Sequence, residues 1–209
     1  MNCCFTYFHQ YLKRTVLKKP ADLRQVRGVQ QTLIESQQQT FPVEWGFQPH
    51  VLLKTVTQFH TNDFENQVLF VTQSVPRILK QVELDATSPM FGCAHLAYWR
   101  DKTSDVADMR RQEAMLTFAL LYSNDYPQSD LRGNEYLQYV VEALLSFWCR
   151  NQYSDGSLDE WYKGERAFAA AAFTCHALAR TLYTMGQDLN SEIKVLAQER
   201  LIRVAEWLL

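Results

Sequence analysis

The sequence lacks the features that would direct a protein to nucleic acid or into a membrane. Its 209 residues contain 21 lysines and arginines against 23 aspartates and glutamates, a formal net charge of −2. This balance argues against a basic nucleic-acid groove. No apolar run reaches the ~18 residues of a membrane span, and lysines and arginines interrupt the first twenty residues, so no signal peptide is predicted. We therefore expect a cytoplasmic protein with no membrane span.

Cysteine and histidine are too scattered to predict a disulfide framework or a metal centre. The five cysteines are an odd number without paired spacing, which is typical of reduced thiols. Cys93, Cys149 and Cys175 lie among apolar residues and are predicted to be buried. Cys93 and His95 have ligand spacing, but two residues do not define a metal site. We predict no metal and no cofactor, and we expect His176, in an alanine-rich segment, to be buried.

Convincing β-strands are also missing, and the sequence predicts an all-α fold. Apolar residues recur at helical spacing in most of the chain. Asp105, Asn134 and Asn190 are predicted helix N-caps, and Gly186 is a predicted helix end. Expected helical segments include 1–19, 21–39, 50–60, 64–82, 107–122, a helix after Asn134, an alanine-rich helix before Gly186, and a last helix after Asn190.

From Asp105 onward the predicted helices recur every ~25 to 30 residues, which indicates stacked helical hairpins in an α/α toroid or a solenoid. Antiparallel neighbours place alternate loops at opposite ends of such a stack. The segment before helix 107–122 and the loop 153–165 should therefore share one end. The loops 124–133 and 186–190 should share the other end.

We predict a single helical domain over residues 1–209, with undiagnostic helices in 1–84 and toroid-like hairpins in 85–209. A complete toroid usually needs more helices than this chain contains. We therefore expect either an α/α toroid or an incomplete one, in which the apolar C-terminal helix either docks back onto the core or marks a truncation.

Two segments at the predicted shared end are rich in reactive side chains. Asp155-Gly156 predicts a turn, and the carboxylates that follow suit the positive N-terminus of the next helix. Such a loop either ties two helices together or lines a cleft. The first segment contains His95, Tyr98, Trp99 and Arg100, and the second contains Asp155, Asp159, Glu160, Trp161, Tyr162, Glu165 and Arg166.

These segments carry a resemblance to a known family. The motif Gly92-Cys93-x-His95-x-x-Tyr98-Trp99 and the later motif Asp155-Gly156-Ser157-x-Asp159-Glu160-Trp161-Tyr162 resemble helical-toroid domains of the heparinase II/III type. These domains are associated with bacterial polysaccharide gene clusters. The resemblance covers about residues 85–187. It implies an α/α toroid and a protein that acts on, or binds, acidic polysaccharide.

The activity that this resemblance implies is β-elimination of uronic acid chains. A lyase neutralises the uronate carboxylate, removes the C5 proton with a base and protonates the leaving oxygen with an acid. On this hypothesis Arg100 or Arg166 neutralises the carboxylate, His95 is the base, and Tyr98 or Tyr162 is the acid. The remaining candidates would bind the sugar: Trp99, Asp155, Asp159, Glu160, Trp161 and Glu165.

Alternatives remain open at the level of sequence. Leu96 and Ala97 replace a polar residue and a proline of the family pattern, which favours a carbohydrate-binding or scaffold domain without catalysis. The carboxylates of the second segment could instead form the acid pair of a toroidal glycosidase. Gln152 and its neighbours also resemble the Gln-Trp repeats of terpenoid cyclases, where the glutamine caps the next helix as a structural tie. No Asp-rich acid motif accompanies it.

Overall fold

The structure is a computed structural model that describes residues 63–95, 106–126 and 129–209. Within these ranges the chain is helical and has no strand, which confirms the all-α prediction there. The helices expected within 1–60 lie outside the described residues. The described elements are α3 (Asp63–Leu79), the 3-10 helix η3 (Met109–Glu113), α5 (Ala114–Ser123), α6 (Glu135–Asn151), α7 (Phe168–Met185) and α8 (Ser191–Trp207).

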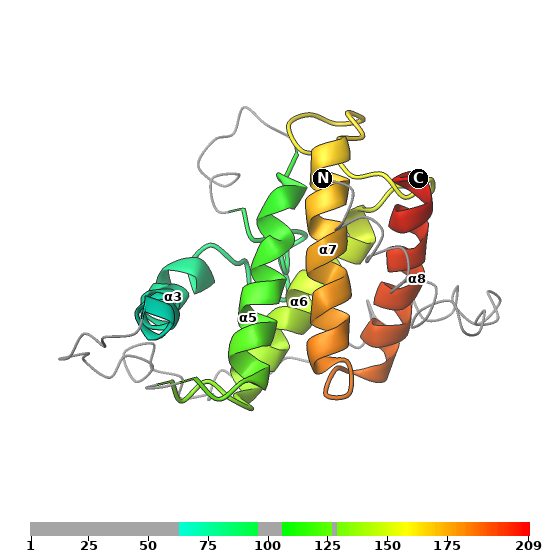
Figure 1. Cartoon of the computed structure of the whole chain (residues 1–209). Coiled ribbons are helices and arrows are strands. Elements are labelled where there is room, and N and C mark those ends of the chain that lie inside the picture. The colour runs from blue at the N-terminus through cyan, green and yellow to red at the C-terminus, as the bar shows by residue number, and fades with distance from the viewer. Residues whose placement is uncertain (1–62, 96–105, 127–128) are drawn as a thin grey trace.

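Helices α5 to α8 form two antiparallel hairpins that lie side by side (Figure 1). Helix α5 packs against α6 and α7 packs against α8, while α5 also contacts α7 and α6 also contacts α8. One layer therefore holds α5 and α7, and the other holds α6 and α8. The core lies between the layers, where Phe118, Trp148 and Leu178 are fully buried. None of the described helices is both long and apolar enough to cross a membrane.

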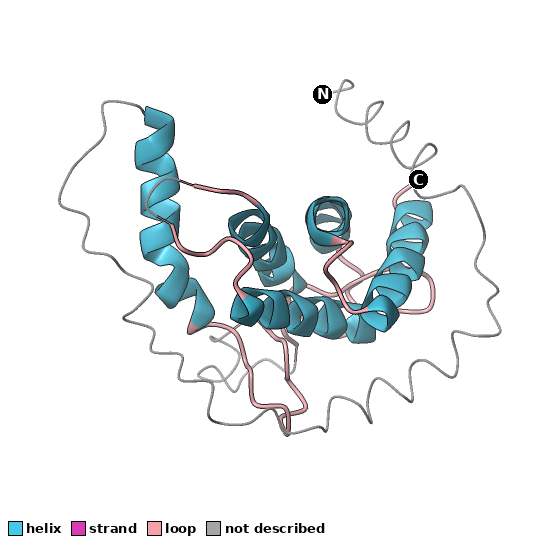
Figure 2. Cartoon of the chain, turned by 90° about the horizontal axis from the view of Figure 1, so that it is seen from below, coloured by secondary structure: helices cyan, strands magenta, loops and turns pink. Residues whose placement is uncertain are grey.

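Helix α3 crosses the hairpins at a steep angle. It is seen end-on in Figure 1 and lengthwise in Figure 2, whereas α7 is lengthwise in Figure 1. Val75 and Leu79 of α3 are buried in the same core as the hairpins. Pro76 lies in the last turn, where the helix continues through it without being split. The helix predicted over 64–82 is therefore present, with a slightly earlier end.

The N-caps of two hairpin helices are those predicted from the sequence. The side-chain oxygen of Asn134 accepts the Leu137 N–H at 3.1 Å, and that of Asn190 accepts the Glu192 N–H at 2.9 Å. Each bond satisfies an N–H group that the helix start leaves without a partner.

The helix predicted to start near residue 107 begins later. Asp108 accepts the Arg110 N–H and caps η3, so a tight 3-10 turn occupies 109–113 and α5 begins at Ala114. The predicted cap, Asp105, lies outside the described residues.

The loops lie at the two ends of the stack as predicted. At one end, shown at the top of Figure 1, the Met109 N–H donates to the Asp159 carbonyl at 3.4 Å. At the other end, the Ser123 hydroxyl donates to the Thr184 carbonyl at 3.4 Å. The described parts of the two polar segments therefore meet at one end of the hairpins.

Candidate functional site

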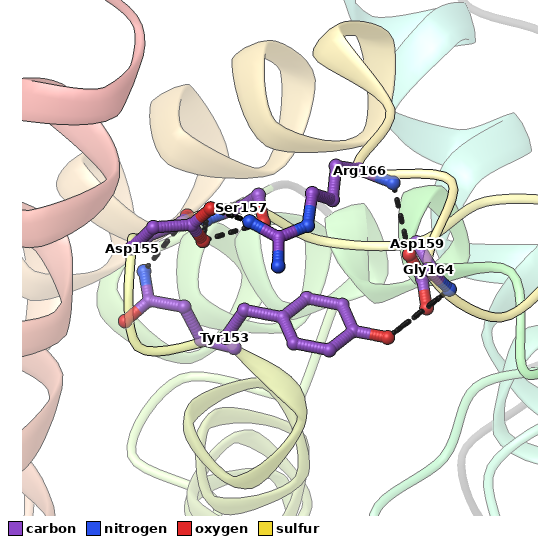
Figure 3. A network of polar contacts seen from close by, with 8 residues as sticks. Tyr153, Asp155, Ser157, Asp159, Gly164 and Arg166 are labelled. Atoms are coloured by element: carbon purple, nitrogen blue, oxygen red, sulfur yellow. Dashed lines mark hydrogen bonds and ion pairs between the residues drawn. The ribbon is translucent and has the colours of Figure 1, made fainter.

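Residues 153–167, here called the rim loop, join α6 to α7 and are organised around one carboxylate (Figure 3). Asp159 accepts the Gly164 N–H at 2.9 Å, the Arg166 N–H at 3.0 Å and the Tyr153 hydroxyl at 2.6 Å. Asp159 is only 8% exposed to solvent. The Tyr153 bond raises the pKa of that phenol, because the phenol donates its proton to a carboxylate. Asp159 therefore holds the loop closed.

A second carboxylate forms the predicted turn at the start of the rim loop. Asp155 accepts the Ser157 hydroxyl at 2.6 Å and the Ser157 N–H at 3.0 Å. These bonds, with a smaller contribution from the nearby Arg166 guanidinium, keep the pKa of Asp155 below its usual value. Arg166 pairs with Asp155 and also lies over the Tyr153 ring, 5.3 Å from its centroid. Arg166 is thus engaged inside the loop (Figure 3).

The other two carboxylates fix the tip of the rim loop. Glu165 accepts the backbone N–H groups of Glu160 at 3.1 Å and Trp161 at 2.7 Å. The side chain of Glu160 is 7% exposed and lies 3.3 Å from Arg110 of η3. The Arg110 guanidinium also lies 4.8 Å from the centroid of the Phe173 ring. These contacts connect the loop to η3 and α7.

The predicted placement of these acidic residues at a helix N-terminus is wrong. Helix α7 begins only at Phe168, its N-cap is Ala167, and its first turn contains no acidic residue. Asp159 and Glu165 instead accept N–H groups of the rim loop itself. Their role is to satisfy the loop backbone.

The tip of the rim loop exposes aromatic side chains. Trp161 is 68% exposed and Tyr162 is 65% exposed. Lys163, which follows them, is also exposed. Adjoining exposed rings on a fixed loop form an apolar surface that a ligand can contact. The tip is therefore the part of the site most suited to contact a ligand.

The segment that leads to His95 is fixed by a buried glutamine. Gln112 of η3, 1% exposed, accepts the Ala94 N–H at 2.7 Å and donates to the carbonyls of Gly92 at 2.9 Å and Leu144 at 3.1 Å. Gly92 has φ +83°, and a Cβ there would lie 2.0 Å from the Ala143 carbonyl oxygen. The glycine and the glutamine together let this segment lie directly on α6.

His95 has a defined hydrogen-bonding state. Its Nδ1 accepts the Asp108 N–H at 2.9 Å, so the proton of the neutral imidazole is on Nε2. Burial lowers the pKa of His95. The Asp108 carboxylate opposes this shift, and the Arg111 cation adds to it. This arrangement makes His95 a neutral hydrogen-bond donor and does not suit the base role predicted for it, because a base needs a free nitrogen lone pair.

The structure brings most of the predicted residues together. The Asp108 N–H donates a hydrogen bond to His95, and the N–H of the next residue, Met109, donates one to the Asp159 carbonyl. His95 and the rim loop are therefore joined through two consecutive residues. Tyr98, Trp99 and Arg100 lie outside the described residues. The predicted residues within the rim loop are Asp155, Asp159, Glu160, Trp161, Tyr162, Glu165 and Arg166.

Gln152 is the structural tie that one interpretation of the sequence predicts, but it acts on a different helix. It is 7% exposed, and its side-chain nitrogen donates to the Arg200 carbonyl of α8 at 2.9 Å. It does not cap α7, the next helix. Gly156 completes the contact with α8, because a Cβ there would lie 2.3 Å from the Arg203 carbonyl oxygen.

The thiols are buried as predicted. Burial raises the pKa to about 11 for Cys93 and to about 12 for Cys149 and Cys175, so all three are protonated at neutral pH. Among the described residues no group of three or more histidine, cysteine or acidic side chains could hold a metal ion. The prediction of a buried His176 is wrong, since this residue is exposed on α7.

No protein-family model, curated protein or solved structure matches the chain. The resemblance to heparinase II/III-type domains thus depends on the motif residues alone.

Proposed function

We propose that the rim loop binds an acidic oligosaccharide, in a helical domain of the heparinase II/III type. The observation that carries this proposal is the exposed Trp161-Tyr162 pair on a loop that the Asp159 and Glu165 carboxylates hold in place. Aromatic rings offer a flat apolar face with a polar edge, which suits the C–H faces and hydroxyls of a sugar. A loop fixed before binding also loses less conformational entropy when the ligand binds.

The exposed cations of the rim loop favour an acidic sugar, because the carboxylates of the loop are engaged by N–H groups and arginines. Lys163 is exposed and forms no ion pair in the described part of the chain. Its ammonium is therefore available to a uronate carboxylate. Arg166 is 53% exposed at its side chain even while it pairs with Asp155. The Nε2–H group of His95 supplies a neutral donor on the other segment.

The carboxylates of the rim loop do not favour the glycosidase alternative. Hydrolysis requires one protonated acid and one available carboxylate on either side of a glycosidic bond. Asp159 and Glu165 each accept backbone N–H groups, while Asp155 and Glu160 pair with arginines. Recruiting any of them to catalysis would break a bond that shapes the loop.

We extend the proposal to the fold. Two hairpins with α5 beside α7 and α6 beside α8 have the arrangement that repeats in an α/α toroid or solenoid. On this view they form one arc of a toroid, and the rim loop lies at its mouth.

A second candidate function is uronate β-elimination, and the hydrogen bond of His95 favours a specific version of it. A neutral donor at Nε2 suits neutralisation of the uronate carboxylate. The C5 proton would then be removed by a tyrosine in its ionised form, either Tyr162 or Tyr98, and the phenol formed in this way would give the proton to the leaving oxygen. This version gives His95 the neutralising role that the sequence hypothesis assigns to Arg100 or Arg166, and it gives the tyrosine the role of base.

Binding is tested by thermal unfolding, followed by circular dichroism, with a panel of uronic acid oligosaccharides. A ligand that binds only the folded state adds about 2.7 kcal/mol of stability at a hundred times Kd. We expect a higher Tm for the wild type, and no shift for the double variant Trp161→Ala/Tyr162→Ala. The matched control is Phe70→Ala, which removes a ring that is 71% exposed on α3 and should keep the shift. An unshifted wild type across the panel would contradict the proposal.

Elimination is tested separately by the ultraviolet absorbance of the unsaturated product. His95→Gln keeps an N–H donor near the position of Nε2, whereas His95→Ala removes it. If His95 neutralises the carboxylate, the glutamine variant retains more activity than the alanine variant. An equal loss of activity in both variants would favour His95 as the base. If the wild type forms no unsaturated product, elimination is ruled out and only the binding proposal stands.

A further inference from the structure

Residues of helices α5 and α7, together with Glu113, which precedes α5, line an apolar groove. The groove has a volume of about 600 Å³. Small residues on both helices, such as Ala114, Ala172 and Ala177, let another backbone approach closely. The full lining is Glu113, Ala114, Leu116, Thr117, Leu120, Ala172, Phe173, His176 and Ala177. We call this lining, with Arg180 and Tyr183, the α5–α7 face.

The exposed stripe of α7 extends this groove. Phe173, His176, Arg180 and Tyr183 recur at helical spacing and are all exposed. Phe173 is 53% exposed and Tyr183 is 65% exposed. The stripe has the same residue classes and spacing in both directions, with an aromatic residue at each end and two nitrogen-bearing side chains between them. Exposed apolar surface of this kind marks an interaction site.

Two opposite charges lie apart along the same face. Glu113 is at the start of α5 and lines the groove beside Phe173 and His176. Arg180 is further along α7, where its guanidinium lies 5.8 Å from the centroid of the Tyr183 ring. Helices α5 and α7 run in the same direction (Figure 1), so the negative charge is nearer the rim loop and the positive charge nearer the other end. Neither side chain forms an ion pair in the described part of the chain.

We infer that this face binds the same face of a second copy, with the two α7 helices antiparallel. A two-fold interface requires a self-complementary patch, in which residue i meets residue j and j meets i. Antiparallel pairing about a point near residue 178 sets Phe173 opposite Tyr183 of the other copy. It also brings Arg180 of each copy toward Glu113 of the other. The two opposite charges, which lie apart in one copy, become complementary across the pair.

A second copy explains the face better than an unrelated helix would. A two-fold axis uses both ends of the palindromic stripe and both charges at once. The inference is independent of the proposed glycan site, because the rim loop lies at the end of the hairpins and the face lies along their length.

Sedimentation over a concentration series tests the inference with the full chain. We expect a reversible dimer for the wild type. Glu113→Arg and Arg180→Glu should each weaken dimerisation by about tenfold or more, because each sets like charges against one another. The double variant Glu113→Arg/Arg180→Glu should restore it. The matched control is Glu206→Arg, an equal charge reversal at an exposed position of α8, which should leave the dimer unchanged.

The dimerisation measurements give distinct results if the α5–α7 face does not bind a second copy. A monomeric wild type at every concentration overturns the inference, as does a dimer that Glu113→Arg leaves intact. A double variant that stays monomeric while its thermal unfolding matches the wild type also overturns it. Tyr183→Ser supplies a check without a charge change, since loss of the ring should weaken the dimer too. Capture of a different partner on this face, with no self-association, would contradict a second copy as the occupant.

Discussion

The loops that precede and follow α7 connect neighbouring antiparallel helices in different ways. After α7, residues 186–190 make a short connection whose polar groups serve the adjacent helices. The Asn190 N–H donates to the Glu142 carboxylate at 2.8 Å, and the Asp188 carbonyl accepts the Gln138 side chain at 2.6 Å. Before α7, the rim loop is much longer and its polar groups serve its own backbone. Asp159 alone accepts two N–H groups and a phenol of that loop.

The difference shows what a connection alone requires. A helix hairpin can be closed by a short turn and an N-cap, as 186–190 demonstrates with Asn190. The rim loop instead buries two carboxylates, Asp159 at 8% and Glu160 at 7% exposure, which is costly unless each is fully paired. It also leaves Trp161 and Tyr162 in water. Those features are unnecessary for a connection and are expected of a binding surface.

The largest expected effect on stability comes from removing the Asp159 carboxylate. Asp159→Ala leaves the Gly164 and Arg166 N–H groups without their acceptor, so we expect a loss of about 3 kcal/mol in the free energy of unfolding. The matched change in the short connection, Asn190→Ala, should cost only about 1 kcal/mol. Urea unfolding measures both. Equal losses in the free energy of unfolding for the two variants would show that the rim loop depends no more on its carboxylate than the short connection depends on its cap.

A smaller loss is expected from a methyl group at Gly156. This residue has φ +100°, and its Cβ would lie 2.3 Å from the Arg203 carbonyl oxygen, so Gly156→Ala should cost about 2 kcal/mol through strain and displacement of α8. Gly133 has φ +66° and open space around it. Gly133→Ala should therefore cost about 1 kcal/mol. A tolerated Gly156→Ala in urea unfolding would show that the rim loop does not rest on α8.

The two regions also differ in how far the sequence predicts them. Asn134 and Asn190 were predictable as caps because the acceptor and the donor lie within three residues of each other. The bonds of Asp159 are not, because they depend on how the whole loop closes. The acceptor role of His95 depends in the same way on a contact with Asp108 across thirteen positions.

Helix α7 shows a different limit of sequence reasoning. Its alanines and aromatics give apolar character on every side, so periodicity alone does not identify the buried face. Ala170 and Ala171 are buried, while Phe173 and Tyr183 are exposed. His176 shares the exposed stripe, which explains why its predicted burial is wrong. The stacking of α5 on α7, by contrast, follows from the regular recurrence of helices along the chain.

The pH dependence of stability should include a contribution from His95. Its pKa in the folded protein is below the usual value of 6.5, so between the two values the unfolded chain binds more protons. Stability from this residue is present above about pH 6.5 and is lost as pH falls through the lower, folded pKa. We expect Tm to decrease over that window in the wild type and to decrease less in His95→Gln. Parallel curves for the two proteins would show that the imidazole is not held neutral.

The smallest expected effect on stability is at the exposed tip. Trp161→Ala removes a ring that is 68% exposed, so the free energy of unfolding should change by no more than about 0.5 kcal/mol. Urea unfolding beside the Asp159→Ala variant measures the contrast. A large loss would mean that the indole stabilises the fold, and the tip could no longer be regarded as a free binding surface.

Hydrogen–deuterium exchange with and without a uronic acid oligosaccharide tests the central claim most directly, because it reports both loops in one experiment. The account predicts that the ligand slows exchange in the rim loop and in the adjoining residues 106–111. It predicts no change in 186–190. Protection at 186–190 instead, or at neither loop under conditions in which the oligosaccharide raises Tm, would contradict the assignment of the rim loop as the binding site.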